Sequence, residues 1–343
     1  MDLKEKIELL GNLRAFLEEK PAVLKEGIRL AGEHNKWFTE DNVNRSLGHI
    51  AQKFLNEDAL LKWTDSFKDK IPNEKPSKKL ALIMAGNIPL VGFHDFLAGF
   101  IANYTSVIKM SSKDKFLWPI INDFLKSQNS EIADYIHFSE RISSPDAIIA
   151  TGDDNTHRYF EYYFSKYPHI LRKNRNSVAF LDGTESDEQL KLLSDDVFTY
   201  FGLGCRNITN VLIPEDYDVT KLLDIWEDKY KLSQHTGYLN NFDYHRSLLL
   251  LSKREHLVSD FLILYEDASL SSPVSCLHYQ KYKNIEHGIE MLNNFKDGIQ
   301  CIAGENEILR EKKLAISFGK TQFPELDDYA DGQNTLEFLI KNH

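Results

Sequence analysis

The sequence predicts an α/β protein with two doubly wound, three-layer α/β/α domains and an N-terminal helical segment. Its 343 residues are enough for two domains. From Leu80 onward, short apolar runs alternate with helical stretches, which is typical of parallel sheets. The alternation restarts at Ser177. We therefore expect N-terminal helices and a first α/β domain over 1–175, a second domain over 176–320, and a C-terminal segment over 321–343.

The first 70 residues are expected to be helical. Ile7, Leu10, Leu13 and Leu17 recur at spacings of three and four, which places them on one face of a helix. The polar stretch 72–79 contains two prolines and is the best candidate for a linker.

Short apolar runs give the strands of the two domains, and the stretches between them give the helices. In the first domain we expect strands at Leu80–Met84, Thr105–Met110 and Ala147–Thr151, and helices at Phe93–Asn103, Phe116–Leu125 and 155–167. In the second we expect strands at Val178–Leu181, Asn210–Ile213, Ser247–Leu251, Leu262–Tyr265 and Cys301–Ala303, and helices at 186–203, Thr220–Asp228 and Ile285–Asn293.

Composition and charge exclude several classes of protein. The formal net charge is −11 and no basic run occurs, so nucleic acid is not an expected partner. No apolar stretch is long enough for a transmembrane segment, and the first residues lack the core of a signal peptide. Three widely spaced cysteines indicate neither disulfides nor a metal site. We expect a cytoplasmic protein without a bound metal.

Cys205 is the candidate nucleophile. It follows Gly202 and Gly204, which allow close approach of backbone and ligand, and it precedes Arg206, which favours the thiolate form. The structural alternative is that Cys205 is simply a small buried apolar residue.

Three further candidates follow predicted strands, where ligands bind in open α/β sheets. The Asn87 amide could donate a hydrogen bond to an oxyanion, or it could only stabilise its own turn. Lys109 could meet ribose or phosphate, or it could be a solvated residue at a strand end. Gly152 and Asp153 precede a helix whose N-terminal amides could face a pyrophosphate, although a carboxylate there repels phosphate unless it points away.

In their order and spacing these segments resemble the aldehyde dehydrogenase superfamily, and more closely its long-chain acyl-CoA reductases, over about residues 78–340. The segment 85–90, Ala-Gly-Asn-Ile-Pro-Leu, is similar to the glycine-asparagine-x-proline motif of that family. The segment 107–112 follows, with Lys109 placed 22 residues after Asn87. Residues 150–153, the Gly204-Cys205 pair and segments 317–319, 322–324 and 331–332 complete the resemblance.

The resemblance implies roles for individual residues. Cys205 would be the nucleophile, and Asn87 would donate to the thioester oxygen. Lys109 and Ser111 would bind the ribose side of the cofactor, and Gly152 and Asp153 would lie near its pyrophosphate. The implied cofactor is NADPH, with NADH possible, and the implied partners are acyl-CoA or an acyl carrier protein. A homo-oligomer is also possible.

One departure favours reduction over oxidation. Aldehyde-oxidising members of the superfamily carry a general-base glutamate about 34 residues before the cysteine, whereas residues 171–173 here are Leu-Arg-Lys. We therefore expect an acyl thioester reductase that forms a fatty aldehyde. Two alternatives stay open: an acyltransferase or thioesterase that uses Cys205 without a redox step, and a catalytically silent protein that binds an acyl carrier.

Overall fold

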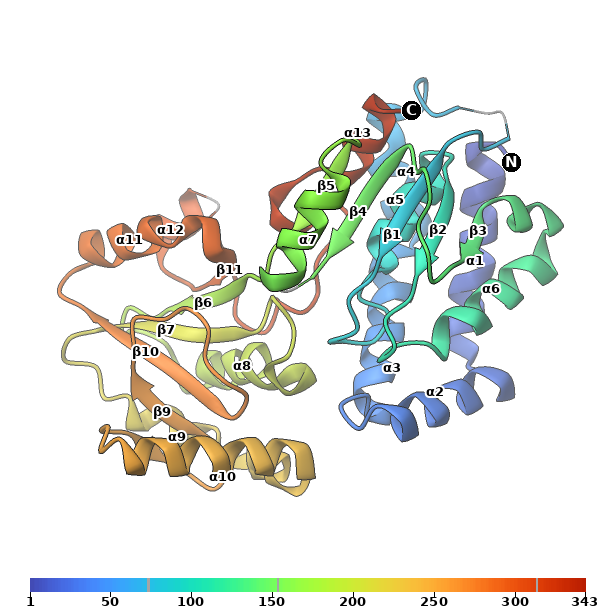
Figure 1. Cartoon of the computed structure of the whole chain (residues 1–343). Helices are drawn as coiled ribbons and strands as arrows, with labels where there is room; N and C mark the ends of the chain where they lie inside the picture. The colour runs from blue at the N-terminus through green and yellow to red at the C-terminus, as the bar shows by residue number, and fades with distance from the viewer. Residues whose placement is uncertain (73–74, 153, 313) are drawn as a thin grey trace. The chain divides into compact units, whose positions relative to one another are not determined.

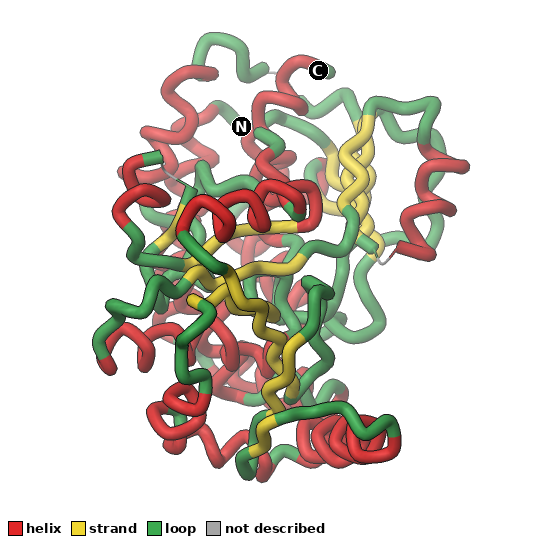
Figure 2. The backbone as a smooth tube through the Cα atoms, turned by 90° about the vertical axis from the view of Figure 1, so that its left-hand side faces the viewer, coloured by secondary structure: helices red, strands yellow, loops and turns green. Residues whose placement is uncertain are grey.

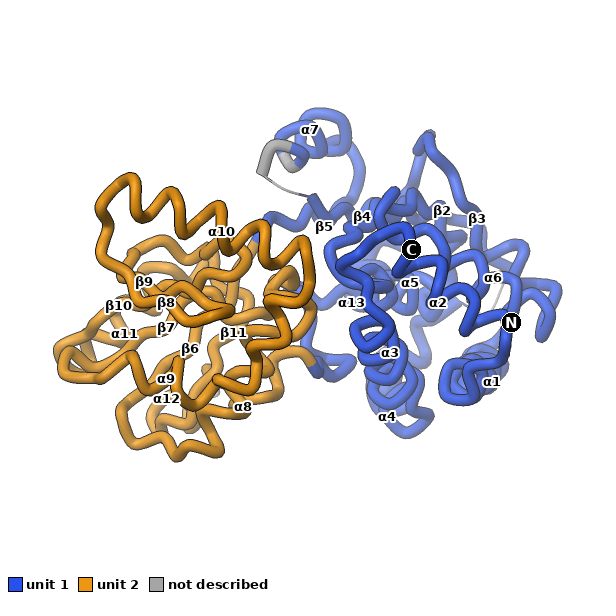
Figure 3. Tube along the Cα trace, turned by 90° about the horizontal axis from the view of Figure 1, so that it is seen from below, with its two compact units in different colours: residues 1–174, 323–343 blue, residues 175–322 orange. Residues whose placement is uncertain are grey.

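The computed structural model describes residues 1–72, 75–152, 154–312 and 314–343. The chain forms two compact units (Figure 3). The first unit contains residues 1–174 and 323–343, and the second contains residues 175–322.

Helices make up the beginning of the first unit. They are α1 (Leu3–Glu19), α2 (Ala22–His34), α3 (Glu40–His49) with the π-helical turn η1 (Ile50–Phe54), α4 (Glu57–Thr64) and the short turn η2 (Asp65–Phe67). The Asp2 and Glu5 side chains form a capping box at the start of α1. The apolar stripe of α1 is buried, as its spacing predicts.

The sheet of the first unit has five parallel strands in the order β3-β2-β1-β4-β5. The strands are β1 (Lys79–Ile83), β2 (Thr105–Lys109), β3 (Ile136–Phe138), β4 (Ala147–Thr151) and β5 (His169–Arg172). β2 and β3 follow one another on one side of β1, whereas β4 and β5 lie on its other side. The carboxyl ends of β1 and β4 therefore form a switch point, where such sheets bind ligands.

Helices cover both faces of this sheet (Figures 1 and 2). The bounds of the remaining helical elements are α5 (Phe93–Ile101), α6 (Leu117–Gln128), η3 (Ser130–Asp134), α7 (Asp154–Phe164), η7 (Ala330–Gly332) and α13 (Thr335–Lys341). Buried side chains of α1 to α6 and α13 share one apolar core with Leu80, Leu82 and Ile149. Phe160 and Phe164 of α7 pack against residues on the opposite face.

The sheet of the second unit has seven strands in the order β12-β11-β6-β7-β10-β9-β8. They are β6 (Asn176–Phe180), β7 (Ile208–Pro214), β8 (Leu257–Val258), β9 (Ile263–Glu266), β10 (Cys276–Tyr282), β11 (Ile299–Ala303) and β12 (Ala315–Ile316). All neighbouring strands are parallel except β8 and β9.

This second sheet also lies between two helical layers. The helical elements are α8 (Asp187–Phe198), η4 (Thr199–Gly202), α9 (Thr220–Ile225), η5 (Glu227–Gln234), α10 (Thr236–Leu251), α11 (Ile285–Asn294), η6 (Lys296–Gly298) and α12 (Glu307–Glu311). α8 and α9 share a core with one face of the sheet, and α10, α11 and α12 pack on the other. The predicted three-layer α/β/α class is confirmed.

One predicted strand is wrong. Residues 247–251 belong to helix α10 rather than to a strand. The run of leucines there predicts a strand, but Leu248, Leu250 and Leu251 are 43%, 60% and 82% exposed on the helix. Only Leu249 of this run reaches the core.

Candidate functional site

The predicted nucleophile Cys205 lies on the loop between α8 and β7. The turn η4 begins this loop, and its residues Tyr200, Phe201 and Gly202 have φ values of 55°, 58° and 77°. Left-handed backbone costs a non-glycine residue roughly 1–2 kcal/mol. The surrounding structure must therefore hold the turn in place. The Cys205 side chain is partly exposed.

Asn207, which is fully buried, makes the hydrogen bonds that hold this loop. Its Oδ1 accepts from the Gly204 backbone N–H at 2.8 Å. Its Nδ2 donates to three carbonyl oxygens at the end of α8 and the start of η4, at distances of 3.0, 3.3 and 2.8 Å, those of Asp196, Val197 and Thr199. Helix ends leave such carbonyls without intrahelical partners, so Asn207 joins the end of α8 to the Cys205 loop.

A second contact reaches the loop from β6. The Ser177 hydroxyl donates to the Cys205 carbonyl at 3.0 Å, accepts from the Cys301 N–H at 3.2 Å, and lies 3.0 Å from the Cys301 sulfur. Burial raises the pKa of the Cys301 thiol to about 11, although the charge of Arg206 opposes the shift. Burial likewise raises the pKa of Cys276 to about 12. Both of these thiols are therefore protonated near neutral pH, which makes them poor nucleophiles.

Asn87 lies in the turn that follows β1 in the first unit and is partly exposed. A Cβ atom on Gly86 would lie 2.3 Å from Ser111 Oγ, so this turn packs directly against the turn after β2. The buried Asp114 carboxylate accepts from the Leu90 N–H at 2.7 Å and fixes the far end of the Asn87 turn. The structure thus brings Asn87 and Ser111 onto neighbouring turns. Their joint action with Cys205, a residue of the second unit, stays a prediction.

An open groove on the first unit contains Lys109. It has a volume of about 430 Å³ and lies between the ends of β1 and β2 and the aromatic side of α7. Its lining contains the cations Lys109 and Lys166 and the carboxylate of Glu140. The aromatic residues Tyr159, Phe160 and Tyr163 form part of its apolar wall. Such a lining suits a ligand with a flat ring and hydroxyl or phosphate groups.

Gly152 follows β4 as predicted. A Cβ atom on Gly152 would lie 2.9 Å from Thr156 Cβ and 3.0 Å from a ring atom of Phe160, so only glycine lets α7 begin this close to the strand. Asp153 lies outside the described residues. Its predicted place near a pyrophosphate stays a prediction.

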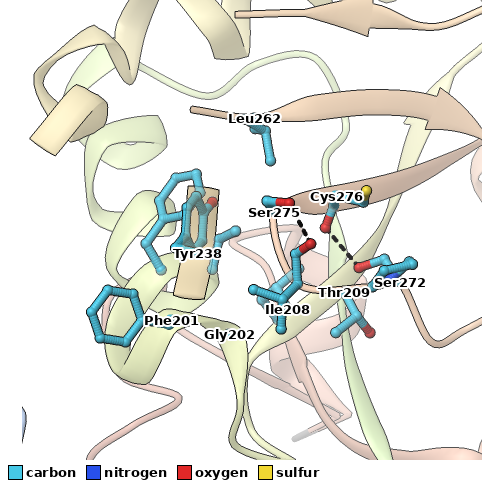
Figure 4. Close-up of a pocket in the computed structure, with 13 residues that line it drawn as sticks. Phe201, Gly202, Ile208, Thr209, Tyr238, Leu262, Ser272, Ser275 and Cys276 are labelled. Carbon is cyan, nitrogen blue, oxygen red and sulfur yellow. Dashed lines mark hydrogen bonds between the residues drawn. The ribbon is translucent and has the colours of Figure 1, made fainter. Parts of the chain in front are cut away.

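A small pocket of about 20 Å³, lined by both polar and apolar residues, lies against the η4 turn in the second unit (Figure 4). Phe201 and Gly202 form part of its wall, together with Tyr238 of α10 and the residues that precede β10. Tyr238 is only 1% exposed. Its hydroxyl has no hydrogen-bond partner among the described residues. The left-handed turn therefore shapes a cavity as well as presenting Cys205.

Within the described ranges, no group of three or more His, Cys, Asp or Glu side chains is placed to hold a metal ion. None of the described helices combines the length and the apolar character needed to cross a membrane.

Comparison with known proteins bears on the fold. No protein-family model and no curated protein matches the sequence. Among solved structures, the chain is similar to aldehyde dehydrogenase 21 from Physcomitrella patens in complex with the reaction product succinate. The TM-score is 0.71 and the identity 10%, over 100% of this chain and 84% of that one.

Two bacterial structures are similar as well. For an NAD-dependent aldehyde dehydrogenase from Sinorhizobium meliloti the TM-score is 0.66 and the identity 10%, over 92% of this chain and 74% of that one. For an NAD-dependent benzaldehyde dehydrogenase from Corynebacterium glutamicum the TM-score is 0.66 and the identity 13%, over 95% of this chain and 80% of that one. The chain therefore has the aldehyde dehydrogenase fold, as its sequence predicts.

Proposed function

We propose that this protein is a nicotinamide-dependent oxidoreductase that reduces an acyl thioester to an aldehyde through an acyl-enzyme on Cys205. The observation that carries the proposal is the state of the three thiols within an aldehyde dehydrogenase fold. Cys205 is partly exposed on the loop that follows a strained turn. Cys276 is buried, and Cys301, although partly exposed like Cys205, has its sulfur 3.0 Å from the Ser177 hydroxyl; the pKa values of both thiols are raised by desolvation. Strained backbone held by surrounding hydrogen bonds is a feature of functional sites.

The groove that contains Lys109 fits a nicotinamide cofactor. Lys109 and Lys166 supply positive charge, and Tyr159 and Tyr163 are 67% and 61% exposed beside them. An adenine ring can stack on such aromatic faces, while a lysine can meet ribose hydroxyls or phosphate. When bound, NADPH (or NADH) would supply a hydride to the acyl carbon. Lys109, Ser111, Gly152 and Asp153 are the residues proposed to hold it.

The proposed chemistry of the chain's own residues begins with the Cys205 thiolate. Its sulfur attacks the thioester carbonyl, a new C–S bond forms, and the carrier thiolate leaves. The Cys205 N–H and the Asn87 amide stabilise the negative charge that develops on the carbonyl oxygen. Hydride addition would leave the alkoxide of a thiohemiacetal on Cys205. Its C–S bond then breaks, which releases the aldehyde and returns the Cys205 thiolate, and the carrier thiolate takes a proton from water.

The surroundings of Arg172 support reduction over hydrolysis. The guanidinium of Arg172 forms a buried ion pair with Asp95 and donates to the Thr335 hydroxyl at 3.1 Å. The segment in which a water-activating glutamate would be expected thus contributes a buried cation. Because no carboxylate in that segment can activate water, the acyl-enzyme would survive until a hydride is supplied.

The deciding experiment follows NADPH consumption with a panel of acyl-CoA thioesters of increasing chain length, with aldehydes trapped and identified by mass spectrometry. The expected result is aldehyde formed in a one-to-one ratio with NADPH oxidised, and its loss in Cys205→Ala. Free fatty acid or a transferred acyl group without NADPH oxidation would instead indicate a thioesterase or an acyltransferase. A Cys205→Ala variant that reduces thioesters at the wild-type rate would refute the assignment.

A further inference from the structure

We infer that Asn207 is a positioning residue that aims the backbone N–H of Cys205 at the oxyanion formed when Cys205 is acylated. The inference rests on the proposed role of Cys205 as a nucleophile. It adds a residue to which neither the sequence pattern nor the family resemblance gives a role.

Asn207 holds both backbone groups of Gly204, the residue before Cys205. Its side-chain Oδ1 accepts from the Gly204 N–H at 2.8 Å, and its own backbone N–H donates to the Gly204 carbonyl at 3.0 Å. The peptide bond between Gly204 and Cys205 is trans. In a trans peptide the N–H points opposite to the carbonyl. Because Asn207 binds the Gly204 carbonyl, the Cys205 N–H must point away from Asn207.

Ser177 fixes the next peptide. Its hydroxyl donates to the Cys205 carbonyl at 3.0 Å. The peptide planes on both sides of the Cys205 Cα are therefore held by named hydrogen bonds, which leaves the backbone of Cys205 little freedom. The direction of the Cα–Cβ bond, and with it the region open to the sulfur, follows from those two planes.

The side-chain amide of Asn207 also holds the strained turn that leads to Cys205. Its Nδ2 group contacts three backbone carbonyls, those of Asp196, Val197 and Thr199. An aspartate at this position would keep an acceptor for Gly204 but would turn a second oxygen toward these carbonyls. Repulsion between acceptors would push the turn and the Gly204 peptide out of place while the volume of the side chain stayed nearly the same.

The chain offers a matched control three residues further on, within β7. Asn210 is also fully buried. Its Nδ2 donates to the Asp267 and Ser269 carbonyls at 3.2 and 2.9 Å, and its Oδ1 accepts from Gln280 at 3.2 Å. An Asn210→Asp change thus disturbs a comparable buried network that does not include the Cys205 peptide. It reports the effect of lost stability alone.

The experiment compares two reactions of Cys205 in the full-length protein. Acylation by p-nitrophenyl acetate passes through an oxyanion, whereas alkylation by iodoacetamide does not. Peptide mapping identifies the modified cysteine, and Cys205→Ser gives the background. In Asn207→Asp we expect the ratio of acylation rate to alkylation rate to fall about 10²-fold, as for loss of an oxyanion donor. In Asn210→Asp the ratio should stay at the wild-type value.

Ser177→Ala removes a single hydroxyl and gives a second, milder variant if Asn207→Asp folds poorly. We expect the same ratio to fall in it, by about tenfold, because only one of the two peptide planes is released. An unchanged ratio in folded Asn207→Asp, or in Ser177→Ala where Asn207→Asp does not fold, would overturn the inference. A fall of both rates by the same factor would also overturn it. If wild-type protein shows this contrast but does not oxidise NADPH with acyl thioesters, the proposed function fails and the role of Asn207 stands.

Discussion

Asp114 provides a direct test of how the Asn87 turn is held. Its carboxylate is 4% exposed, and one oxygen accepts from the Leu90 N–H at 2.7 Å. The other oxygen, Oδ1, has no hydrogen-bond partner among the described residues. Burial raises the pKa of Asp114 from 3.8 to about 7, against the opposing effect of the Leu90 hydrogen bond. The folded protein therefore holds this proton more tightly than the unfolded chain does.

This shift makes the first unit less stable as the pH rises. The cost is absent below about pH 3.8, where both states are protonated, and complete above about pH 7, where both are ionised. A shift of about three pH units at about 1.4 kcal/mol each amounts to about 4 kcal/mol. About 3 kcal/mol of it should appear between pH 4.5 and 8.5. Asp114→Asn keeps an acceptor for Leu90 and cannot ionise, so its stability relative to wild type should rise by that amount.

Urea unfolding at several pH values measures this difference. Three of the four tryptophans, Trp37, Trp63 and Trp118, lie in the first unit, so a Trp226→Phe background makes the fluorescence report that unit alone. The comparison of variant with wild type cancels other groups that titrate in the same range. A difference in unfolding free energy between Asp114→Asn and wild type that does not change with pH would show that water reaches the Asp114 carboxylate in the folded protein.

Three further substitutions test the site. Asn87→Ala should slow acylation of the enzyme by acyl-CoA about 10²–10³-fold, because an oxyanion donor is lost; single-turnover release of CoA measures it, and an unchanged rate would remove Asn87 from the site. Lys109→Gln should weaken NADPH binding at least tenfold, since a hydrogen bond from a charged donor contributes about 1.5–3 kcal/mol; fluorescence titration checks this, and equal affinity would move the cofactor elsewhere. Tyr238→Phe removes a buried hydroxyl that finds no hydrogen-bond partner in the described part of the chain. It should leave the unfolding free energy unchanged or raise it by about 1 kcal/mol; a clear loss of stability would mean that the hydroxyl is hydrogen-bonded in solution.

The strands that sequence patterns located are mostly buried on both faces. Ala147–Thr151 reads as an unbroken apolar run and is β4 as expected. The central strand β10 was not predicted, because His278 and Gln280 interrupt its apolar pattern. These side chains are 3% and 8% exposed. His278 makes a hydrogen bond with the Ser269 carbonyl, and Gln280 donates to Asn210. Hydropathy alone cannot identify buried polar residues of this kind, since their partners, nine residues away for His278 and 70 for Gln280, are brought close only by the fold.

The same limit applies to the candidate site. The glycines beside Cys205 predict a close approach of backbone and ligand, and the structure shows in addition that Gly202 has a positive φ of 77°. The sequence did not indicate that Tyr200 and Phe201 share this conformation, because aromatic residues rarely adopt it. Only this turn brings the end of α8 and its carbonyls close to Asn207, so the sequence alone does not reveal the role of Asn207. The signal available was the tendency of asparagine to bind nearby backbone.

Lys6 gives a prediction of opposite sign in the same unit as Asp114. It is fully buried, and its Nζ donates to Asn103 Oδ1 at 2.9 Å and to the Ile101 carbonyl at 3.3 Å. Burial lowers the pKa of Lys6 from 10.5 to about 7. The folded protein therefore holds this proton less tightly than the unfolded chain. The cost of a buried ammonium is complete below about pH 7 and disappears as the pH approaches 10.5.

Lys6→Met keeps an apolar side chain of similar length and removes the charge. Loss of its hydrogen bonds should cost about 1–3 kcal/mol at every pH. Relief of the buried charge should offset this loss at pH 6 but not at pH 9.5. The unfolding free energy of the variant should therefore fall by about 3 kcal/mol relative to that of wild type between these two pH values. With Asp114 ionised above pH 7 and Lys6 charged below it, these two groups together destabilise the first unit most near neutral pH. Urea unfolding in the Trp226→Phe background measures the change, and a difference between Lys6→Met and wild type that is constant with pH would show that Lys6 is solvated and that α1 does not bury it.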